Sequence, residues 1–159
     1  MPCVWGVHNK SQIFLDVGII DAATAANVTP GPYAPLIQNP PIFKALVDTG
    51  AEVTMISPDV AGKVGLTPIG QIPIQGVGHT MTYHNAYLFH VAFVVPLSQT
   101  GQPLPAGAGV DTMIFMQPNP IYGGEITSSG DHFDVLLGMD VISTGSLAVE
   151  GNGTFSFSF

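Results

Sequence analysis

The chain has 159 residues, the length of one domain (1–159), and 46% of them are hydrophobic, which is enough to form a core. Only 9% are charged. Eleven acids, three lysines and no arginine give a net charge of -8, which argues against binding nucleic acid or an anionic membrane surface. The longest apolar run, 86–97, is shorter than the ~20 residues of a spanning helix, so we expect no membrane insertion. The first residues lack the layout of a signal peptide, and we expect the chain to act in the cytoplasm or after release from a larger precursor.

Glycine (19 residues) and proline (14 residues) are frequent, which favours many short strands joined by turns. Alternating apolar residues and turn residues predict strands at 12–21, 42–47, 52–57, 72–75, 81–95, 112–116, 133–137, 146–150 and 154–159. Ser57, Pro58 and Gly65 mark the ends of a short helix, and 139–144 predicts one or two helical turns. Long loops are expected at about 22–41, 96–111 and 117–132. The sequence therefore predicts an all-β fold with one or two short helices.

The segment 45–57 contains the most informative residues. An apolar strand leads directly into Asp48, Thr49 and Gly50, and a second apolar strand follows. An isolated Asp-Thr-Gly is a weak signal, but here the strands place the acid on a tight turn at the floor of a mostly apolar site. A carboxyl group in such surroundings is suited to acid–base catalysis. Asp48 is therefore the candidate catalytic residue.

In three places, in the expected order, the chain resembles the retropepsin-like aspartic proteases, the single-lobe relatives of pepsin. The first is 48–66, which runs from the Asp-Thr-Gly through a small residue, Thr54 and an apolar pair to a helix ending at Gly-Leu. The second is glycine-rich 76–79, at the position of the family's flap, a hairpin that closes over the substrate. The third is 135–140, an apolar run followed by glycine and a short helix. The resemblance covers about 43–159, except for 96–131.

The resemblance implies an acid-protease half-barrel that is active as a symmetric homodimer. A pepsin-type site uses two aspartates that share a proton, and this chain offers one, so Asp48 would meet its counterpart across a two-fold axis. The pair would activate a water that hydrolyses a peptide bond in an extended, mainly apolar peptide or protein substrate, with no metal or cofactor. Thr49 and Gly50 would support the site. The implied substrate-binding residues are Ala51, Glu52, Met55, Gly76, Val77, Gly78 and Leu136.

Two residues depart from the family pattern. Met139 occupies a position where many retroviral members have an arginine, so any Arg–carboxylate support of the site must be replaced or missing. His79 stands where a flap glycine is common. The strand 155–159, apolar on one face and uncharged, is expected to join the intersubunit sheet, because an unpaired edge of this kind promotes aggregation.

Other acidic residues have simpler interpretations. Asp111-Thr112 lacks the following glycine, so we interpret Asp111 as a loop acid. Asp134 and Asp140 flank the third motif and are expected to accept hydrogen bonds from backbone amides, and the histidines to be surface or packing residues. The alternative function is a catalytically inactive binding or regulatory dimerisation module of the same fold. A structural β-domain with no enzymatic role is the third hypothesis.

Overall fold

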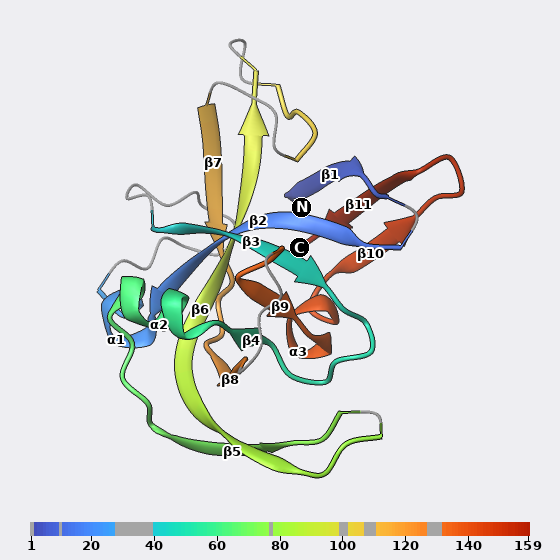
Figure 1. Cartoon of the computed structure of the whole chain (residues 1–159). Coiled ribbons are helices and arrows are strands. Elements are labelled where there is room, and N and C mark those ends of the chain that lie inside the picture. Colours follow the sequence, from blue (N-terminus) through green and yellow to red (C-terminus); the bar gives the residue numbers. More distant parts are fainter. Residues whose placement is uncertain are drawn as a thin grey trace.

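Two β-sheets make up the fold in the computed structural model of the chain (Figure 1). The structure describes residues 2–9, 11–27, 40–76, 78–98, 102–106, 111–126 and 132–159. In chain order the elements are β1 (Cys3–Val7), β2 (Ile13–Asp21), α1 (Ala22–Ala25), β3 (Ile42–Val47), β4 (Met55–Ile56), α2 (Pro58–Val64), β5 (Gly70–Ile74), β6 (Thr82–Leu97), β7 (Asp111–Met116), β8 (Ile121–Glu125), β9 (Val135–Leu137), α3 (Met139–Ile142), β10 (Ser146–Val149) and β11 (Thr154–Ser158). The prediction of an all-β fold is confirmed, and the described residues contain three short helices where one or two were predicted.

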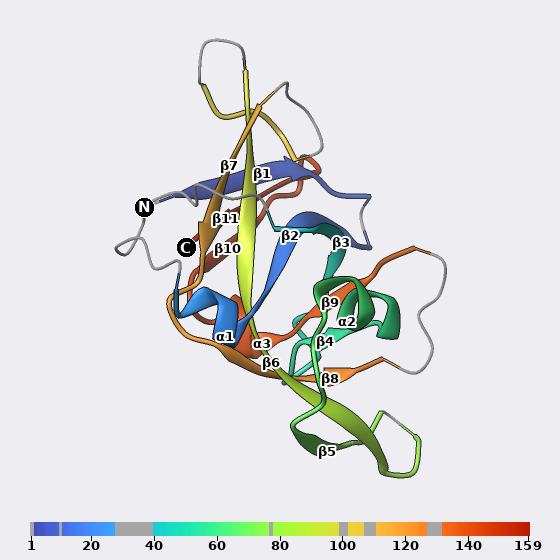
Figure 2. The ribbon, with the colours of Figure 1, turned by 90° about the vertical axis from the view of Figure 1, so that its left-hand side faces the viewer.

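The larger sheet has the strand order β2-β3-β9-β4-β8-β6-β5, with β7 also paired to β6. Strand β6, sixteen residues long, pairs with β5 near its start, with β8 and β2 in its middle and with β7 at its end. Because β2 pairs with both β3 and β6, the sheet curves back on itself around a core that includes Phe89 and Phe93 of β6. Helices α1 and α2 lie on the side that faces the viewer in Figure 2.

The smaller sheet has the order β1-β11-β10 and packs its apolar face onto the same core. The alternation expected at 154–159 is present: Phe155 and Phe157 are buried, and Phe157 meets Phe93 edge-on with ring centroids 5.1 Å apart. However, β11 is paired on both sides within its own chain, by β1 and by β10. The expectation of an otherwise unpaired edge at 155–159 is therefore wrong, because both edges of β11 are already paired.

Most other elements lie where the sequence predicts them. Helix α2 begins at the predicted cap, where Ser57 Oγ accepts a hydrogen bond from Val60 N, and ends at Gly65 with φ 80°. The predicted strand 52–57 shortens to Met55–Ile56, because 52–54 bonds instead to the start of α3. The predicted loop 22–41 begins with α1, and the predicted loop 117–132 contains β8. The parts of the three predicted loops at 28–39, 99–101, 107–110 and 127–131 lie outside the described residues.

Candidate active site

Asp48 lies at the carboxyl end of β3, directly beside the end of β9. Strands β3 and β9 are parallel, with Val47 opposite Leu137, and Asp48 N donates to Leu137 O at 3.0 Å. A tight turn follows, in which Ala51 N donates to Asp48 O at 3.2 Å and Gly50 N donates to Asp48 Oδ1 at 2.8 Å. Oδ2 of this half-buried side chain makes no hydrogen bond with any described residue. One carboxylate oxygen is thus held in place and the other is available.

The turn is fastened to the third motif by backbone hydrogen bonds. Met139 N donates to Ala51 O at 2.8 Å, and Asp140 N donates to Glu52 O at 3.2 Å. These bonds come from the first turn of α3, where backbone N–H groups have no partner inside the helix. Many retroviral members have an arginine at the position of Met139. Here the backbone of the same segment holds the turn, so no arginine is needed for that support.

A second set of bonds joins Thr54 to Asp140, 86 positions apart in the sequence. Thr54 is fully buried; its N donates to Asp140 Oδ2 at 2.9 Å and its Oγ1 donates to Asp140 Oδ1 at 2.6 Å. Thr54 Oγ1 also accepts from Gly138 N at 3.0 Å. The prediction that Asp140 accepts backbone hydrogen bonds is confirmed, and Asp134 does so too, from Lys44 N at 3.3 Å. That Asp140 ties the segment after Asp48 to α3 was not predicted.

An apolar strip follows one face of the sheet next to Asp48. Leu136 of β9 lies opposite both Leu46 of β3 and Met55 of β4, and Met55 lies opposite Gly124 of β8. Directly paired residues share a face, so these side chains form one surface. Leu46, Met55 and Leu136 are half-buried and belong to neither core cluster. The structure thus places the predicted residues Met55 and Leu136 together and adds Leu46. The alternation Phe43, Ala45, Val47 toward the core could have identified Leu46.

The strip continues into the β5–β6 hairpin. A Cβ on Gly124 would lie 2.7 Å from Ile72 Cδ1 and 3.1 Å from Ile74 Cδ1, so these two side chains of β5 fill the space above that glycine. Neither isoleucine was among the predicted site residues. The absent side chain of Gly124 therefore lets the base of the hairpin pack against the strip.

The tip of this hairpin contains the predicted glycine-rich segment. Gly76, Gly78 and His79 are exposed, His79 N donates to Gly76 O at 3.0 Å, and Gly78 has φ 76°, a conformation that favours glycine. Val77 lies outside the described residues. The tip, the 48–54 turn and the β10–β11 hairpin all project to the right in Figure 1, on the side away from α1 and α2. Of the remaining predicted residues, Thr49, Gly50 and Glu52 are exposed and Ala51 is half-buried.

A partly buried polar cluster lies at the base of the hairpin. Tyr87 is 4% exposed and its hydroxyl donates to Glu125 Oε2, while Asn85 Nδ2 lies 3.4 Å from both carboxylate oxygens. Burial, and next the hydrogen bond to Glu125, raise the pKa of Tyr87 to about 12. Two of the histidines, which were expected to be surface or packing residues, bond to backbone carbonyls: His84 Nδ1 bonds to Glu125 O at 2.9 Å, and the buried His90 bonds to Gln117 O.

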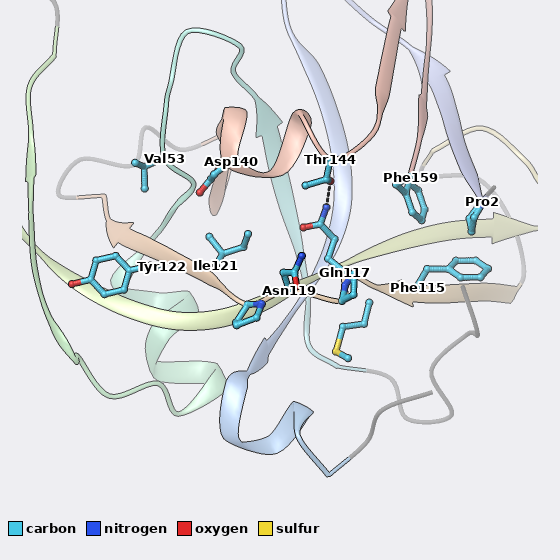
Figure 3. A pocket seen from close by; sticks show the side chains of 13 residues that line it. Pro2, Val53, Phe115, Gln117, Asn119, Ile121, Tyr122, Asp140, Thr144 and Phe159 are labelled. Atoms are coloured by element: carbon cyan, nitrogen blue, oxygen red, sulfur yellow. Dashed lines mark hydrogen bonds between the residues drawn. The ribbon is translucent and has the colours of Figure 1, made fainter. Parts of the chain in front are cut away.

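A cavity of about 600 Å³ lies near the 48–54 turn, and Asp48 does not line it (Figure 3). It borders Val53 and Asp140, and a hydrogen bond from Gln117 Nε2 to Thr144 Oγ1 crosses one wall. Its lining residues are Pro2, Val53, Phe115, Met116, Gln117, Pro118, Asn119, Pro120, Ile121, Tyr122, Asp140, Thr144 and Phe159.

Asp111, the acid of the second Asp-Thr, lies opposite Leu97 at the far end of β6 from the hairpin tip. It does not take part in the Asp48 site.

In the part of the chain that the structure describes, no helix is long and apolar enough to cross a membrane, and no three His, Cys, Asp or Glu side chains are grouped for a metal.

Comparison with known proteins agrees with this geometry. The architecture around Asp48 is that of a retropepsin-like aspartic protease fold. The sequence model for aspartyl proteases matches residues 37–141, and the chain belongs to that family. The chain is similar in structure to a retropepsin-like aspartic protease from Rickettsia conorii, with TM-score 0.56, 12% identity, and coverage of 98% of this chain and 90% of that chain. No curated protein matches the sequence.

Proposed function

We propose that the chain is an aspartic endopeptidase whose catalytic pair consists of Asp48 from each of two identical copies. The observation that carries this proposal is the state of the Asp48 carboxylate. Its Oδ1 is fixed by Gly50 N, its Oδ2 is available, and the turn beneath it is anchored to α3. A catalytic acid must be held rigidly while keeping an atom free to react, and this arrangement meets both needs.

The reaction follows from bringing two such carboxyl groups together. Two carboxylates about 3 Å apart cannot both be ionised, so the pair retains one proton. The ionised member takes a proton from a bound water as that water attacks the scissile carbonyl. The protonated member donates a hydrogen bond to the carbonyl oxygen, and the proton taken from the water then passes to the leaving amine. Thr49, next to Asp48, would bond to the partner's turn and fix the distance between the two acids.

The substrate is an extended peptide with mainly apolar side chains. The strip of Leu46, Met55 and Leu136 offers half-buried apolar surface beside Asp48, and side chains at alternate positions of an extended peptide would fit it. Gly50 is exposed and lets the peptide backbone approach, and Ala51 and Glu52 lie next along the turn. The β5–β6 hairpin would close over the peptide with its tip, 76–79.

The test compares two Asp-Thr sites of the same chain. Wild-type protein, Asp48→Asn and Asp111→Asn are incubated with a peptide library, and the products are identified by mass spectrometry. Asp48→Asn keeps the side-chain shape but cannot share the proton, so hydrolysis should fall by about 10²–10⁴-fold. Asp111→Asn alters the exposed Asp at the distant end of β6 and should hydrolyse like the wild type.

The outcomes separate the two functional classes. Equal activity of wild type and Asp48→Asn would refute the catalytic assignment. A wild-type protein that is folded by circular dichroism and dimeric, but cleaves no peptide at any pH, would favour the inactive dimerisation module instead.

A further inference from the structure

The cavity that Asp48 does not line contains a buried amide with one unpaired oxygen. Gln117 is 6% exposed; its N donates to Val91 O at 2.8 Å and its O accepts from His90 Nδ1 at 2.9 Å. Its side-chain Nε2 donates to Thr144 Oγ1, but its Oε1 has no hydrogen-bond partner among the described residues. In those residues no enclosed side-chain oxygen or nitrogen lacks a partner, so Oε1 must open on the cavity that Gln117 lines. A buried carbonyl of this kind is a binding group for a donor on a ligand.

The orientation of this amide is fixed by the residues that follow α3. Thr144 Oγ1 donates its proton to Val141 O at 2.7 Å, so toward Gln117 it can only accept. Nε2 of Gln117 must therefore face Thr144, and Oε1 is turned away from it. Figure 3 shows the Gln117 side chain reaching across the middle of the cavity to Thr144. The cavity thus has an acceptor in a fixed position.

A carboxylate lines the same side of the cavity. Asp140 comes four positions before Thr144, and both side chains face the cavity from above in Figure 3. A carboxylate has about four acceptor positions, and three of them are used here. Oδ1 accepts from Thr54 Oγ1 and Val141 N, and Oδ2 accepts from Thr54 N. One acceptor position of Oδ2 is therefore left for a ligand.

The described part of the chain supplies no cation to balance this charge. Of the two lysines that it contains, Lys63 pairs with Asp59 at 3.0 Å, and Lys44 Nζ lies over the Phe14 ring, 4.3 Å from its centroid. The lining residues that the structure describes include no lysine, arginine or histidine. The whole chain has a net charge of -8, which adds to the negative potential at the cavity.

The other end of the cavity is apolar. Phe115, Met116 and Phe159 line it and are half-buried, and the two phenylalanine rings lie 6.1 Å apart between centroids at an angle of 60°. In Figure 3 these rings lie to the right, and Asp140 lies to the left of Gln117. A volume of about 600 Å³ is typical of a small-molecule site. The cavity therefore suits a molecule with one charged end and one apolar end.

We propose that this cavity binds an organic cation, a guanidinium or ammonium group on an apolar stem. The charged group donates to Gln117 Oε1 and Asp140 Oδ2, and the stem packs against Phe115 and Phe159. An anion would be repelled, and a neutral molecule would leave the carboxylate without a counter-charge. A free small molecule and an Arg or Lys side chain of a peptide both present this chemistry. The site is separate from Asp48, so the proposal goes beyond the proposed function and does not rest on it.

An NMR titration with three probes of the same stem tests the preference for positive charge. Butylguanidinium should shift the side-chain amide signals of Gln117 and of Asn119, another lining residue, saturably, with a dissociation constant of about 1 mM for so small a molecule. Butanol, which lacks the charge, should bind about 10-fold more weakly, and butyrate should leave both signals unshifted. Gln12, exposed between β1 and β2 and outside the cavity, controls for diffuse attraction of cations to an acidic chain.

Two substitutions of Gln117 separate ligand binding from structural damage. Gln117→Met keeps the length of the side chain but removes Oε1, and should weaken butylguanidinium binding by about 10-fold. Gln117→Glu keeps an acceptor and adds a negative charge, and should strengthen binding by about 10-fold. Both variants lose the bond from Nε2 to Thr144, so opposite effects cannot come from that loss. Gln12→Met is the matched control and should bind like the wild type. Thermal unfolding monitors the fold of each variant, and the wild-type titration decides the proposal even if a Gln117 variant does not fold.

Peptide pairs distinguish the two sources of the cation. Apolar peptides with arginine at successive positions are compared with counterparts that contain citrulline, whose side chain has the same shape without the charge. They are bound to Asp48→Asn protein so that no peptide is cleaved. Tighter binding of one arginine peptide, lost when Gln117→Met is added, assigns the site to a side chain of a bound peptide. Equal binding within every pair, together with binding of butylguanidinium, assigns it to a free molecule.

These outcomes are independent of the outcome for catalysis. If butylguanidinium binds no better than butanol, and no arginine peptide binds better than its citrulline counterpart, the proposal is refuted and the protease can still be correct. The proposal is also refuted if the Gln117 signal shifts no more than the Gln12 signal. A saturable preference for the cation that Gln117→Met weakens would hold even if the wild type hydrolysed no peptide.

Discussion

Replacing Gly138 by alanine should disturb the candidate active site without touching Asp48. The backbone of Gly138, with φ -90° and ψ -178°, is one that alanine adopts without strain. The obstacle is space. A Cβ there would lie 2.6 Å from Val53 C, 2.8 Å from Val53 O and 2.9 Å from Thr54 N, where ordinary contact begins at 3.4 Å. All three are backbone atoms, so the segment after the Asp48 turn must move, by up to 3.4 − 2.6 = 0.8 Å.

Two magnitudes follow from this displacement. Overpacking of this kind costs about 1–3 kcal/mol, and loosening the Thr54–Asp140 bonds adds to it, so we expect the free energy of unfolding to fall by about 2–3 kcal/mol. A misplacement of about 1 Å at a reacting group costs about 10²-fold in rate, so kcat/KM should fall by a similar factor. Urea denaturation and peptide hydrolysis at one fixed protein concentration measure both effects.

A glycine in open space provides the control. Gly62 lies inside α2, and a Cβ there would meet nothing within 4 Å. Gly62→Ala should therefore stabilise the protein by about 0.5–1 kcal/mol, through helix propensity alone, and leave hydrolysis unchanged. If Gly138→Ala were as stable and as active as Gly62→Ala, the close contact with Val53 would not position the Asp48 turn, and the reasoning would be refuted.

Three further predictions address other groups. Asp140→Asn puts an amide nitrogen in place of an oxygen that accepts from Thr54, so urea denaturation should show a loss of about 1–3 kcal/mol and peptide kinetics a lower kcat with little change in KM. Tyr87→Phe should lower stability at pH 7 by about 1–3 kcal/mol, because the Glu125 carboxylate loses its main donor. The pKa of Tyr87 is raised from 10.0 to about 12, so the unfolded chain loses that proton first. Wild-type stability should therefore decline by about 1–2 kcal/mol between pH 10 and 12, and denaturation curves of the variant should lack this decline. Hydrolysis through a shared proton should show a bell-shaped pH–rate profile, and a plateau through alkaline pH would contradict an Asp48 pair.

The sequence predicts best those features that local chemistry determines. Helix α2 follows from a serine cap, a proline in the first turn and a glycine at the end, and these signals need no distant partner. The strand and the turn or short helix at 48–50 and 135–140 were also predicted, because each segment combines an apolar strand with residues suited to a tight turn. What their spacing alone does not show is the bond between Thr54 and Asp140, which depends on the parallel pairing of β3 and β9.

Strand β8 shows why other elements were missed. Its sequence, Ile-Tyr-Gly-Gly-Glu, has two glycines and follows a proline-rich stretch, so it was predicted as loop. In the structure a Cβ on Gly123 would lie 2.6 Å from the Phe89 ring and 2.8 Å from Thr54 O. The glycine is thus required by close packing between strands rather than by a turn. Such a requirement depends on neighbours distant in sequence, and local patterns do not contain it.

The hydrogen bonds around Asp48 distinguish what one chain completes from what it leaves for a second. Each backbone group of the turn that bonds does so within the chain, to β9, to α3 or to the turn itself. The terminal strand β11 is likewise completed, between β1 and β10. Asp48 Oδ2 lacks a hydrogen-bond partner among the described residues, and the proposed chemistry needs a second acid beside it. A two-fold contact with an identical copy would supply that acid, which is the physical reason for expecting the chain to work as a symmetric pair.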